Sequence, residues 1–423
     1  MTESVLAHGL GGAADLPIPL SYALIGGSWA LTFSVAILFL FWRTPRLDPD
    51  APGRPLPGWV RRVVDARTTR TAVAVVVAAG TLAVLLTAWL GPDDAQRNPV
   101  PGIVYIFVWV GVMVASLVVG PVWRFLSPPR AMYRGLARIP VRRRYPDGLG
   151  LWPAAAGLFS FAWLELASPE PSSVVSVWVW VLAYLVVTVA GLVLFGTVWA
   201  ERADPLEVYS TLLGRLSPLA RSRDGAFVLR TPLGHLAGTP ALPGTVAVTA
   251  TLLGSTLFDS FAASSSWRDL VDGVSGDSLT IAVLVRTGGL FAFVAAVFVI
   301  FQLAARAAGG LSRADRAALP NQLAHSLIPI AAGYLIAHYL TFLVEKGQAT
   351  LGLRVHYVLS EHPALLGVIK VGAVLTGHIL GVAAAHDRSL RLLPPGHRLT
   401  GQLALMVTMV GFTFAGLYLL FEV

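Results

Sequence analysis

Long apolar segments separated by polar connections recur along the whole of this 423-residue chain. The hydrocarbon core of a bilayer is about 30 Å thick, so a helix rising about 1.5 Å per residue needs about 20 apolar residues to cross it. Windows of that kind predict ten transmembrane helices, at residues 18–42, 71–90, 102–121, 148–167, 173–198, 244–263, 279–304, 320–343, 363–386 and 401–421. The pattern therefore predicts an all-α fold, a polytopic transmembrane helix bundle.

Basic residues gather in alternate connections and so predict the orientation. Segments 43–70, 122–147, 199–243, 305–319 and 387–400 hold 25 Arg and Lys residues. The opposite side, termini included, holds only Arg97, Arg268, Lys346 and Arg354. Because basic connections stay in the cytoplasm, we expect the first set inside and both termini outside the cell.

The composition supports a membrane protein and narrows its chemistry. Hydrophobic residues make up 55% of the chain and charged residues 13%, with a mean hydropathy of +0.70. The net charge of +8 follows from the inward-facing connections, so it does not indicate a nucleic-acid partner. The absence of cysteine excludes disulfides, thiolate metal sites and a cysteine nucleophile. The preference for arginine over lysine is typical of a GC-rich bacterial genome, which predicts a bacterial cytoplasmic membrane.

The longest connection divides the predicted spans into two groups of five. We expect a single integral membrane domain over residues 1–423, with five-helix halves at 1–198 and 244–423 joined by a cytoplasmic loop at 199–243. An odd number of spans in each half places the halves in opposite orientations, as in the inverted repeats of many transporters.

The long loop contains two local patterns. Apolar residues at helical spacing predict a helix along the inner membrane surface, at Leu206, Tyr209, Leu213 and Leu216. Turn residues Asp224 and Gly225 lie between short apolar runs, which predicts a small hairpin.

Five ionisable residues lie at similar depth near the outer ends of predicted spans. They are Glu165, Asp259, Arg286, His338 and Lys370. A charged side chain inside a span costs about 2.5 to 3.5 kcal/mol on insertion scales, so we expect each of these residues to have a bonding partner or a function. Asp259 and Arg286 could simply neutralise each other. Alternatively, the five residues form an outward-facing site or a polar pathway, which His8 and Asp15 near the N-terminus could cover.

Three histidines, His325, His378 and His386, form a second group nearer the cytoplasmic side. Spans eight and nine are antiparallel neighbours, so His325 and His378 can face each other, as packing residues or as ligands. Histidine suits zinc, copper, iron or haem iron. His325 and His338 lie about 220° apart around their helix, so they do not form one chelate.

Four segments resemble signature segments of a family of bacterial polytopic membrane proteins labelled fenitrothion hydrolase, which is organophosphate hydrolase-like. They read AHGLGGAADLPIP, TLFDSFAASSSW, LAHSLIPIAAGYLIAHYL and GHILGVAAAHDRSLRL. The resemblance covers the chain from the first span to the last and implies hydrolysis of an organophosphate triester by a membrane-embedded enzyme. It supplies no catalytic residues. The chain departs from the family in the outer loop after span eight, which is shorter than expected.

A hydrolytic function can be formulated from the polar residues. Hydrolysis of a triester at neutral pH is commonly served by hydroxide bound to a divalent metal ion. We expect His338 as metal ligand and Asp259 as base, assisted by His8 or Asp15. Arg286 or Lys370 would stabilise the phosphoryl oxygens.

Two alternatives have other partners. In a proton- or metal-ion-coupled transporter, the outer acids and His338 take up the ion, and His325 and His378 pass it inward. In a haem-binding redox protein, His325 and His378 are the axial ligands. Beyond the lipid bilayer, we expect a small-molecule or ion substrate and either a homo-oligomer or a partner membrane subunit.

Overall fold

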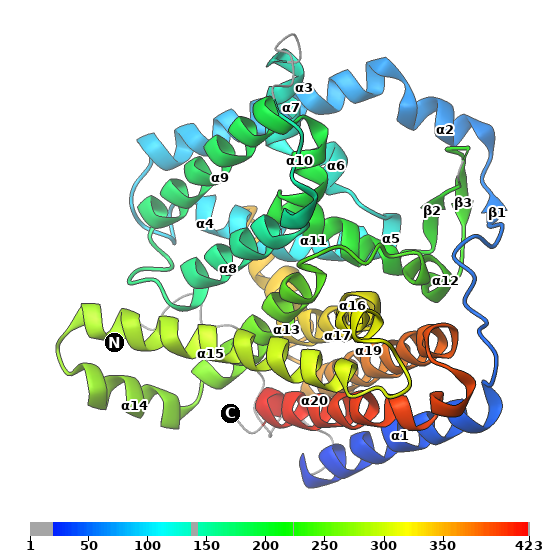
Figure 1. Ribbon diagram of the computed structural model, residues 1–423. Helices are drawn as coiled ribbons and strands as arrows, with labels where there is room; N and C mark the ends of the chain where they lie inside the picture. The colour runs from blue at the N-terminus through cyan, green and yellow to red at the C-terminus, as the bar shows by residue number, and fades with distance from the viewer. Residues whose placement is uncertain (1–19, 137–142, 223, 422–423) are drawn as a thin grey trace. The chain divides into compact units, whose positions relative to one another are not determined.

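The computed structural model describes residues 20–136, 143–222 and 224–421 (Figure 1). The described chain is almost entirely helical, with one small sheet. Nine of its helices are long and apolar enough to cross a membrane: Ser21–Phe41, Arg67–Leu90, Val100–Val119, Val174–Phe195, Thr245–Ala262, Leu279–Arg306, Arg313–Thr350, Pro363–Leu392 and Thr400–Phe421. The prediction of an all-α, multi-pass membrane protein is confirmed.

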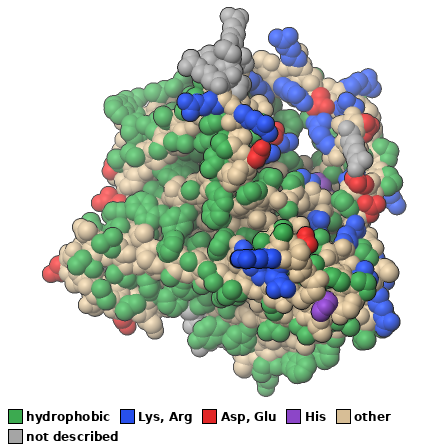
Figure 2. Space-filling view, in the orientation of Figure 1, with side chains coloured by type: hydrophobic (Ala, Val, Ile, Leu, Met, Phe, Trp, Pro, Cys, Tyr) green, Lys and Arg blue, Asp and Glu red, His purple; other side chains and the backbone are tan. Residues whose placement is uncertain are grey.

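The outer surface suits a lipid environment. Large apolar side chains such as Phe33, Val76 and Val407 are exposed. Figure 2 shows that hydrophobic side chains cover much of the face in view, whereas Lys and Arg side chains gather in separate patches. Contiguous apolar surface of this kind is rare on soluble monomers and marks contact with lipid or protein.

The fourth predicted span, residues 148–167, is a shorter element than expected. Helix α8 (Trp152–Leu166) has 15 residues, which corresponds to about 22 Å at 1.5 Å per residue. It begins just after Gly150, whose φ of 45° favours glycine, and it ends before the proline-containing turn at 168–173. This helix is too short to cross the hydrocarbon core perpendicularly.

The described residues divide into two compact units. The first unit comprises Met1–Leu47, Glu165–Pro169 and Pro240–Val423, and the second comprises Asp48–Leu164 and Glu170–Thr239. The division does not follow chain order, because the first transmembrane helix groups with the last ones.

The first unit is a bundle of helices around a shared apolar core. Its helices are α1 (Leu20–Phe41), α13 (Thr245–Ala262), α14 (Ser265–Ser275), α15 (Leu279–Arg306), α16 (Arg313–Leu323), α17 (Leu327–Thr341), α18 (Gly347–Thr350), α19 (Pro363–Leu392) and α20 (Leu403–Phe421). Helices α13, α17 and α19 form its centre, and α1 packs against α19 and α20 (Figure 1). Leu253, Leu327 and Val374 are among the fully buried core residues.

Glycines bring α17 and α19 into backbone contact. A Cβ atom on Gly333 would lie 2.5 Å from the carbonyl oxygen of Ala373, and one on Gly377 would lie 2.5 Å from that of Pro329. Small residues allow this approach because nothing projects between the two backbones. The contacts set the rotation and the register of the two helices.

The span that contains α17 is not a continuous α-helix. A 3₁₀ turn, Ala324–Ser326, precedes α17, and a π-helical turn, Phe342–Lys346, follows it. Pro320 lies inside α16, and Pro329 lies in the first turn of α17. Proline removes a backbone donor and crowds the preceding turn, which accounts for the break before α17.

The second unit holds the remaining elements. Its helices are α2 (Gly58–Asp65), α3 (Arg67–Leu90), α4 (Val100–Gly102), a π-helical stretch (Ile103–Gly111), α5 (Val112–Val119), α6 (Trp123–Leu126), α7 (Pro128–Leu136), most of α8, α9 (Val174–Phe195), α10 (Thr197–Arg202), α11 (Pro205–Leu213) and α12 (Pro232–Ala237). Its strands are β1 (Arg54–Pro55), β2 (Leu219–Arg221) and β3 (Phe227–Leu229), in the order β1-β3-β2.

The predicted hairpin is confirmed. Strands β2 and β3 are antiparallel, with Leu219 opposite Leu229 and Arg221 opposite Phe227. Gly225 in the connecting turn has a φ of 82°, a conformation that glycine adopts without strain.

The prediction of a helix along the membrane surface was wrong. In α11, Leu206, Tyr209 and Leu213 are buried inside the second unit, and so is the charged Glu207. The ring of Tyr209 stacks on that of Trp109 at a centroid distance of 4.5 Å. The apolar stripe therefore packs against protein, and periodicity alone does not distinguish these two environments.

Candidate functional site

A buried carboxylate at the centre of the first unit is bonded to two side chains of α17. His338 Nε2 lies 2.6 Å from Asp259 Oδ2, and the Tyr339 hydroxyl donates to the same oxygen at 2.9 Å. Only 5% of Asp259 and 1% of His338 is exposed. We call these three residues the Asp259 cluster. Hydrogen bonds to a carboxylate are stronger in such a low-dielectric interior than in water.

Local packing explains why these residues meet. Helix α13 is buried almost along its whole length, and Gly254 lets it approach the backbone of α15 at Val294. Asp259 lies in the last turn of α13, where that helix packs against α17. His338 and Tyr339 are consecutive, and their rings meet edge to face at 4.6 Å. One carboxylate can therefore accept bonds from both.

Arg286 does not neutralise Asp259. It lies half-buried on α15, and within the described residues no hydrogen bond or ion pair involves its side chain. The ion pair that the sequence allowed is therefore absent, because Asp259 faces α17. Neither His8 nor Asp15 lies within the described residues.

Lys370 and Glu165 belong to the same unit as the Asp259 cluster. Lys370 is only 1% exposed, on the helix that packs along α17. Glu165, at the end of α8, is half-buried and groups with the first unit. Both side chains have polar or electrostatic contacts. A buried ammonium group on α19 is costly in a membrane, so we regard Lys370 as part of the polar interior of this unit.

Glu345, in the π-helical turn after α17, is a buried carboxylate that was not predicted from the sequence. Its carboxylate accepts bonds from the backbone N–H groups of Leu359 and Ser360, at 3.0 and 2.8 Å, and from the Ser360 hydroxyl at 2.7 Å. The bonds fasten the loop that follows to the end of the helix. A carboxylate about two turns beyond His338 was the available sequence signal.

His325 and His378 are both buried but are bonded differently. His325 Nδ1 lies 3.1 Å from the carbonyl oxygen of Gln322, within its own turn. His378 Nδ1 lies 2.9 Å from the Val374 carbonyl, and its ring meets Tyr334 edge to face at 5.5 Å. Within the described residues His378 Nε2 has no hydrogen-bond partner. A nitrogen in that state is able to accept a proton, a hydrogen bond or a metal ion.

His386 has a structural environment. Its Nδ1 lies 2.9 Å from Gln402 Oε1, and its Nε2 lies 2.8 Å from the carbonyl oxygen of Trp42. The adjacent Asp387 accepts bonds from the Trp42 indole and from the Leu47 N–H, at 3.0 and 3.1 Å. These contacts join the segment after α1 to α19, which continues without a break to Leu392.

The predicted metal and haem sites need more than these residues supply. No three His, Asp or Glu side chains gather closely enough to hold a metal ion in the part of the chain that the structure describes. A metal at the Asp259 cluster would need a further ligand such as His8. A haem between His325 and His378 would need α17 and α19 to separate, since their backbones touch at Gly377. Both cofactors remain predictions.

A second buried carboxylate, Asp204, lies in the second unit and was not predicted. It caps α11 by accepting bonds from the N–H groups of Leu206 and Glu207, at 3.0 and 3.2 Å. The Tyr184 hydroxyl donates to both of its oxygens at 3.1 Å. Burial, together with the Glu207 carboxylate, raises the pKa of Asp204 to about 7.

This pKa predicts a pH-dependent stability. A carboxyl of an unfolded chain titrates near pH 4, so the folded protein binds an extra proton between about pH 4 and 7. The stabilisation by protonated Asp204 is full below that window and is lost as the pH rises through 7. We expect Asp204→Asn to remove up to about 4 kcal/mol of this dependence.

Thermal unfolding of detergent-purified protein from pH 4 to 8 measures the effect. His235 has a pKa lowered to about 4, so its contribution has the opposite sign, and the difference between wild type and variant isolates Asp204. Parallel curves for the two proteins would contradict the assignment.

Comparisons with protein-family models, with curated proteins and with solved structures find no match to this chain. A functional assignment therefore depends on the chemistry of the chain's own residues.

Proposed function

We propose that this protein is a proton-coupled transporter of the bacterial cytoplasmic membrane, with the Asp259 cluster as its proton-accepting site. The observation that carries the proposal is the 2.6 Å contact between Asp259 and His338, buried inside a membrane bundle. A carboxylate and an imidazole at this distance share one proton between them. Ionisable residues within spans commonly mark proton pathways.

The interrupted helix supports translocation. The 3₁₀ turn before α17 contains His325, and the π-helical turn begins three residues after Tyr339. Non-α turns inside helices occur frequently at functional sites, and transporter binding sites commonly use discontinuous helices. The segment that contains His325 and His338 therefore has a non-α turn at each end, where the backbone can rearrange locally.

The α17–α19 pair offers further proton-accepting groups. His325 and His338 lie at opposite ends of α17, and Lys370 and His378 lie two turns apart on α19. Protons can be passed along such a series when small rearrangements bring neighbouring groups into contact. Separation of the two helices at their glycine contact would supply such a rearrangement.

Hydrolysis of an organophosphate ester is a second candidate. Its support is the family resemblance together with the same Asp259–His338 contact, which could orient a general base. The metal ion that binds the hydroxide would need a ligand beyond the described residues. Proton transfer needs only the described residues.

One experiment separates the two candidates. Full-length protein is reconstituted into liposomes that contain a pH-sensitive dye, and a membrane potential is imposed. We expect proton flux above that of empty liposomes and no release of the nitrophenol leaving group from added fenitrothion. Fenitrothion turnover without proton flux would overturn the transport proposal in favour of hydrolysis, and a haem absorption band would favour the redox alternative.

A further inference from the structure

The second unit has a large, partly open cavity with a concentrated positive charge. Its volume is about 940 Å³, and six arginines line it: Arg70, Arg124, Arg130, Arg134, Arg215 and Arg221. No carboxylate is among the described residues that line it. All six arginines come from connections that the charge pattern predicts to face the cytoplasm.

Nearby carboxylates neutralise only part of this charge. Buried Glu207 binds Arg130 through two bonds, at 2.5 and 2.6 Å, and it lies 3.3 Å from Arg124. Asp65 binds both Arg70 and Arg221, at 2.6 and 2.8 Å. Arg124 also lies 3.4 Å from Glu201, the third carboxylate. Four of the six guanidinium groups therefore share three carboxylates.

Two of the arginines have no carboxylate partner within the part of the chain that the structure describes. Arg134 is exposed, and among the described residues it donates only to the backbone carbonyl of Arg70, at 2.6 Å. Arg215 has neither a hydrogen bond nor an ion pair with any described residue. Burial and the neighbouring Arg124 lower the pKa of Arg215, so its charge is held at a cost that a bound anion would offset.

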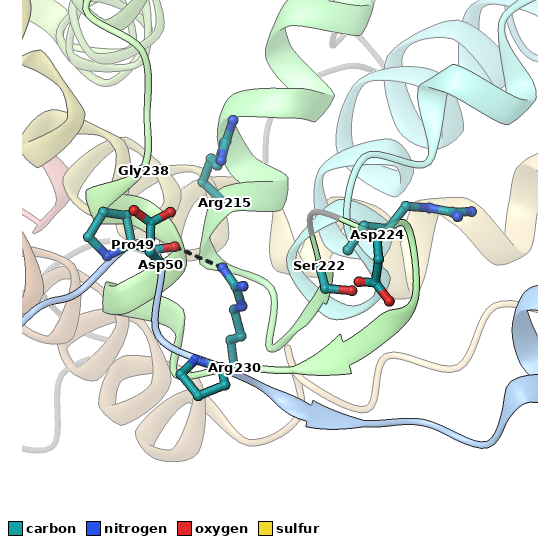
Figure 3. A pocket seen from close by; sticks show the side chains of 9 residues that line it. Pro49, Asp50, Arg215, Ser222, Asp224, Arg230 and Gly238 are labelled. Atoms are coloured by element: carbon teal, nitrogen blue, oxygen red, sulfur yellow. Dashed lines mark hydrogen bonds between the residues drawn. The ribbon is translucent and has the colours of Figure 1, made fainter.

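The guanidinium of Arg215 is not paired with any of the described charged residues near it. It extends from the 3₁₀ turn after α11, and Figure 3 shows its guanidinium pointing away from Arg230 and Asp50. Arg215 and Arg221 also line an adjacent cavity of about 620 Å³, whose wall includes Arg230 and the carboxylates Asp50 and Asp224. In the same region Arg230 is engaged with the carbonyl of Pro49, at 2.9 Å.

Most of the other residues that line the large cavity are apolar. Val122, Phe125, Leu219 and Phe227 are among its lining residues. An anion that bears an apolar group would therefore contact both kinds of wall. Arginine recognises phosphate through paired N–H donors, and basic pockets on the cytoplasmic side of membrane proteins commonly hold anionic headgroups.

We propose that the arginine-lined cavity of the second unit binds a phosphate group, with Arg215 and Arg134 as its principal ligands. The phosphate can belong to an anionic phospholipid or to a soluble phosphorylated compound. The site is independent of the Asp259 cluster and of any transport activity.

Binding to full-length protein in detergent tests the site. Phosphatidylglycerol and phosphatidylcholine are added in mixed micelles, and inorganic phosphate is added in a separate titration. We expect Arg215→Gln and Arg134→Gln each to weaken phosphatidylglycerol binding about tenfold, as expected for loss of a charged hydrogen bond. Native mass spectrometry of the lipid complexes and calorimetry of the phosphate titration are the readouts.

The control is Arg268→Gln, which changes an exposed arginine on α14 in the other unit. It should bind as wild type does. A loss confined to phosphatidylglycerol identifies a lipid headgroup, and a loss that includes inorganic phosphate identifies a soluble ligand. If Arg215→Gln and Arg134→Gln bind phosphatidylglycerol and inorganic phosphate with the same affinities as wild type, the proposal is overturned.

Discussion

Replacing Asp259 with Asn is expected to lower proton flux into proteoliposomes at least about 100-fold, the usual contribution of a positioned proton-transfer group. The amide still accepts a hydrogen bond through its oxygen, so the contacts of His338 and Tyr339 can persist in part. It cannot be protonated, however, so the proton shared across the 2.6 Å contact is lost. The rate of dye quenching after a potential is imposed measures the flux.

Two matched variants make the result interpretable. Asp259→Glu keeps a carboxyl and should retain measurable flux with a shifted pH profile. Asp269→Asn makes the same chemical change at an exposed position of α14 and should behave as wild type. Elution as a single folded species in detergent checks that each variant is intact. Wild-type flux in a well-folded Asp259→Asn protein would exclude the Asp259 cluster as the proton acceptor.

Replacing Gly377 with Ala is expected to destabilise the first unit by about 1 to 3 kcal/mol, the usual cost of overpacking a core. The new Cβ atom would lie 2.5 Å from the carbonyl oxygen of Pro329, a backbone atom that cannot rotate away. The two central helices must then separate. The midpoint of thermal unfolding in detergent measures the loss.

The matched control is Gly288→Ala on α15. No atom lies within 4 Å of a Cβ built at that position, so the variant should be at least as stable as wild type. Removing a helical glycine adds about 0.5 to 1 kcal/mol, since the unfolded chain loses freedom. Equal destabilisation by both substitutions would show that close contact of α17 with α19 is not what Gly377 supplies.

Predictions from the sequence were correct where the physical cause of an element lies within a single segment. The hairpin around Gly225 follows from turn chemistry, and the long helices follow from their hydropathy. The same signals failed at α11, because an apolar stripe packs as well against protein as against lipid. They also predicted too long a helix at α8, because the apolar composition extends beyond the residues that form the helix.

The candidate site was predicted as a set of residues but not as a set of contacts. Hydropathy singles out Asp259, His338 and Lys370, because any ionisable residue inside a span is conspicuous. It does not show that Asp259 turns toward α17 and leaves Arg286 unpaired in the described chain. Spacing along one helix does not define its rotation relative to the next helix.

The sequence by itself determined that this is an all-α, multi-pass membrane protein and which ionisable residues its spans contain. That much is local, since bilayer thickness sets the length of each apolar segment independently of its neighbours. Only the tertiary structure decided that Asp259 meets His338, that Glu207 meets Arg130, and that Arg215 lines a cavity. These pairings join residues far apart in the chain, and they depend on helix register, which side-chain packing sets between helices such as α17 and α19.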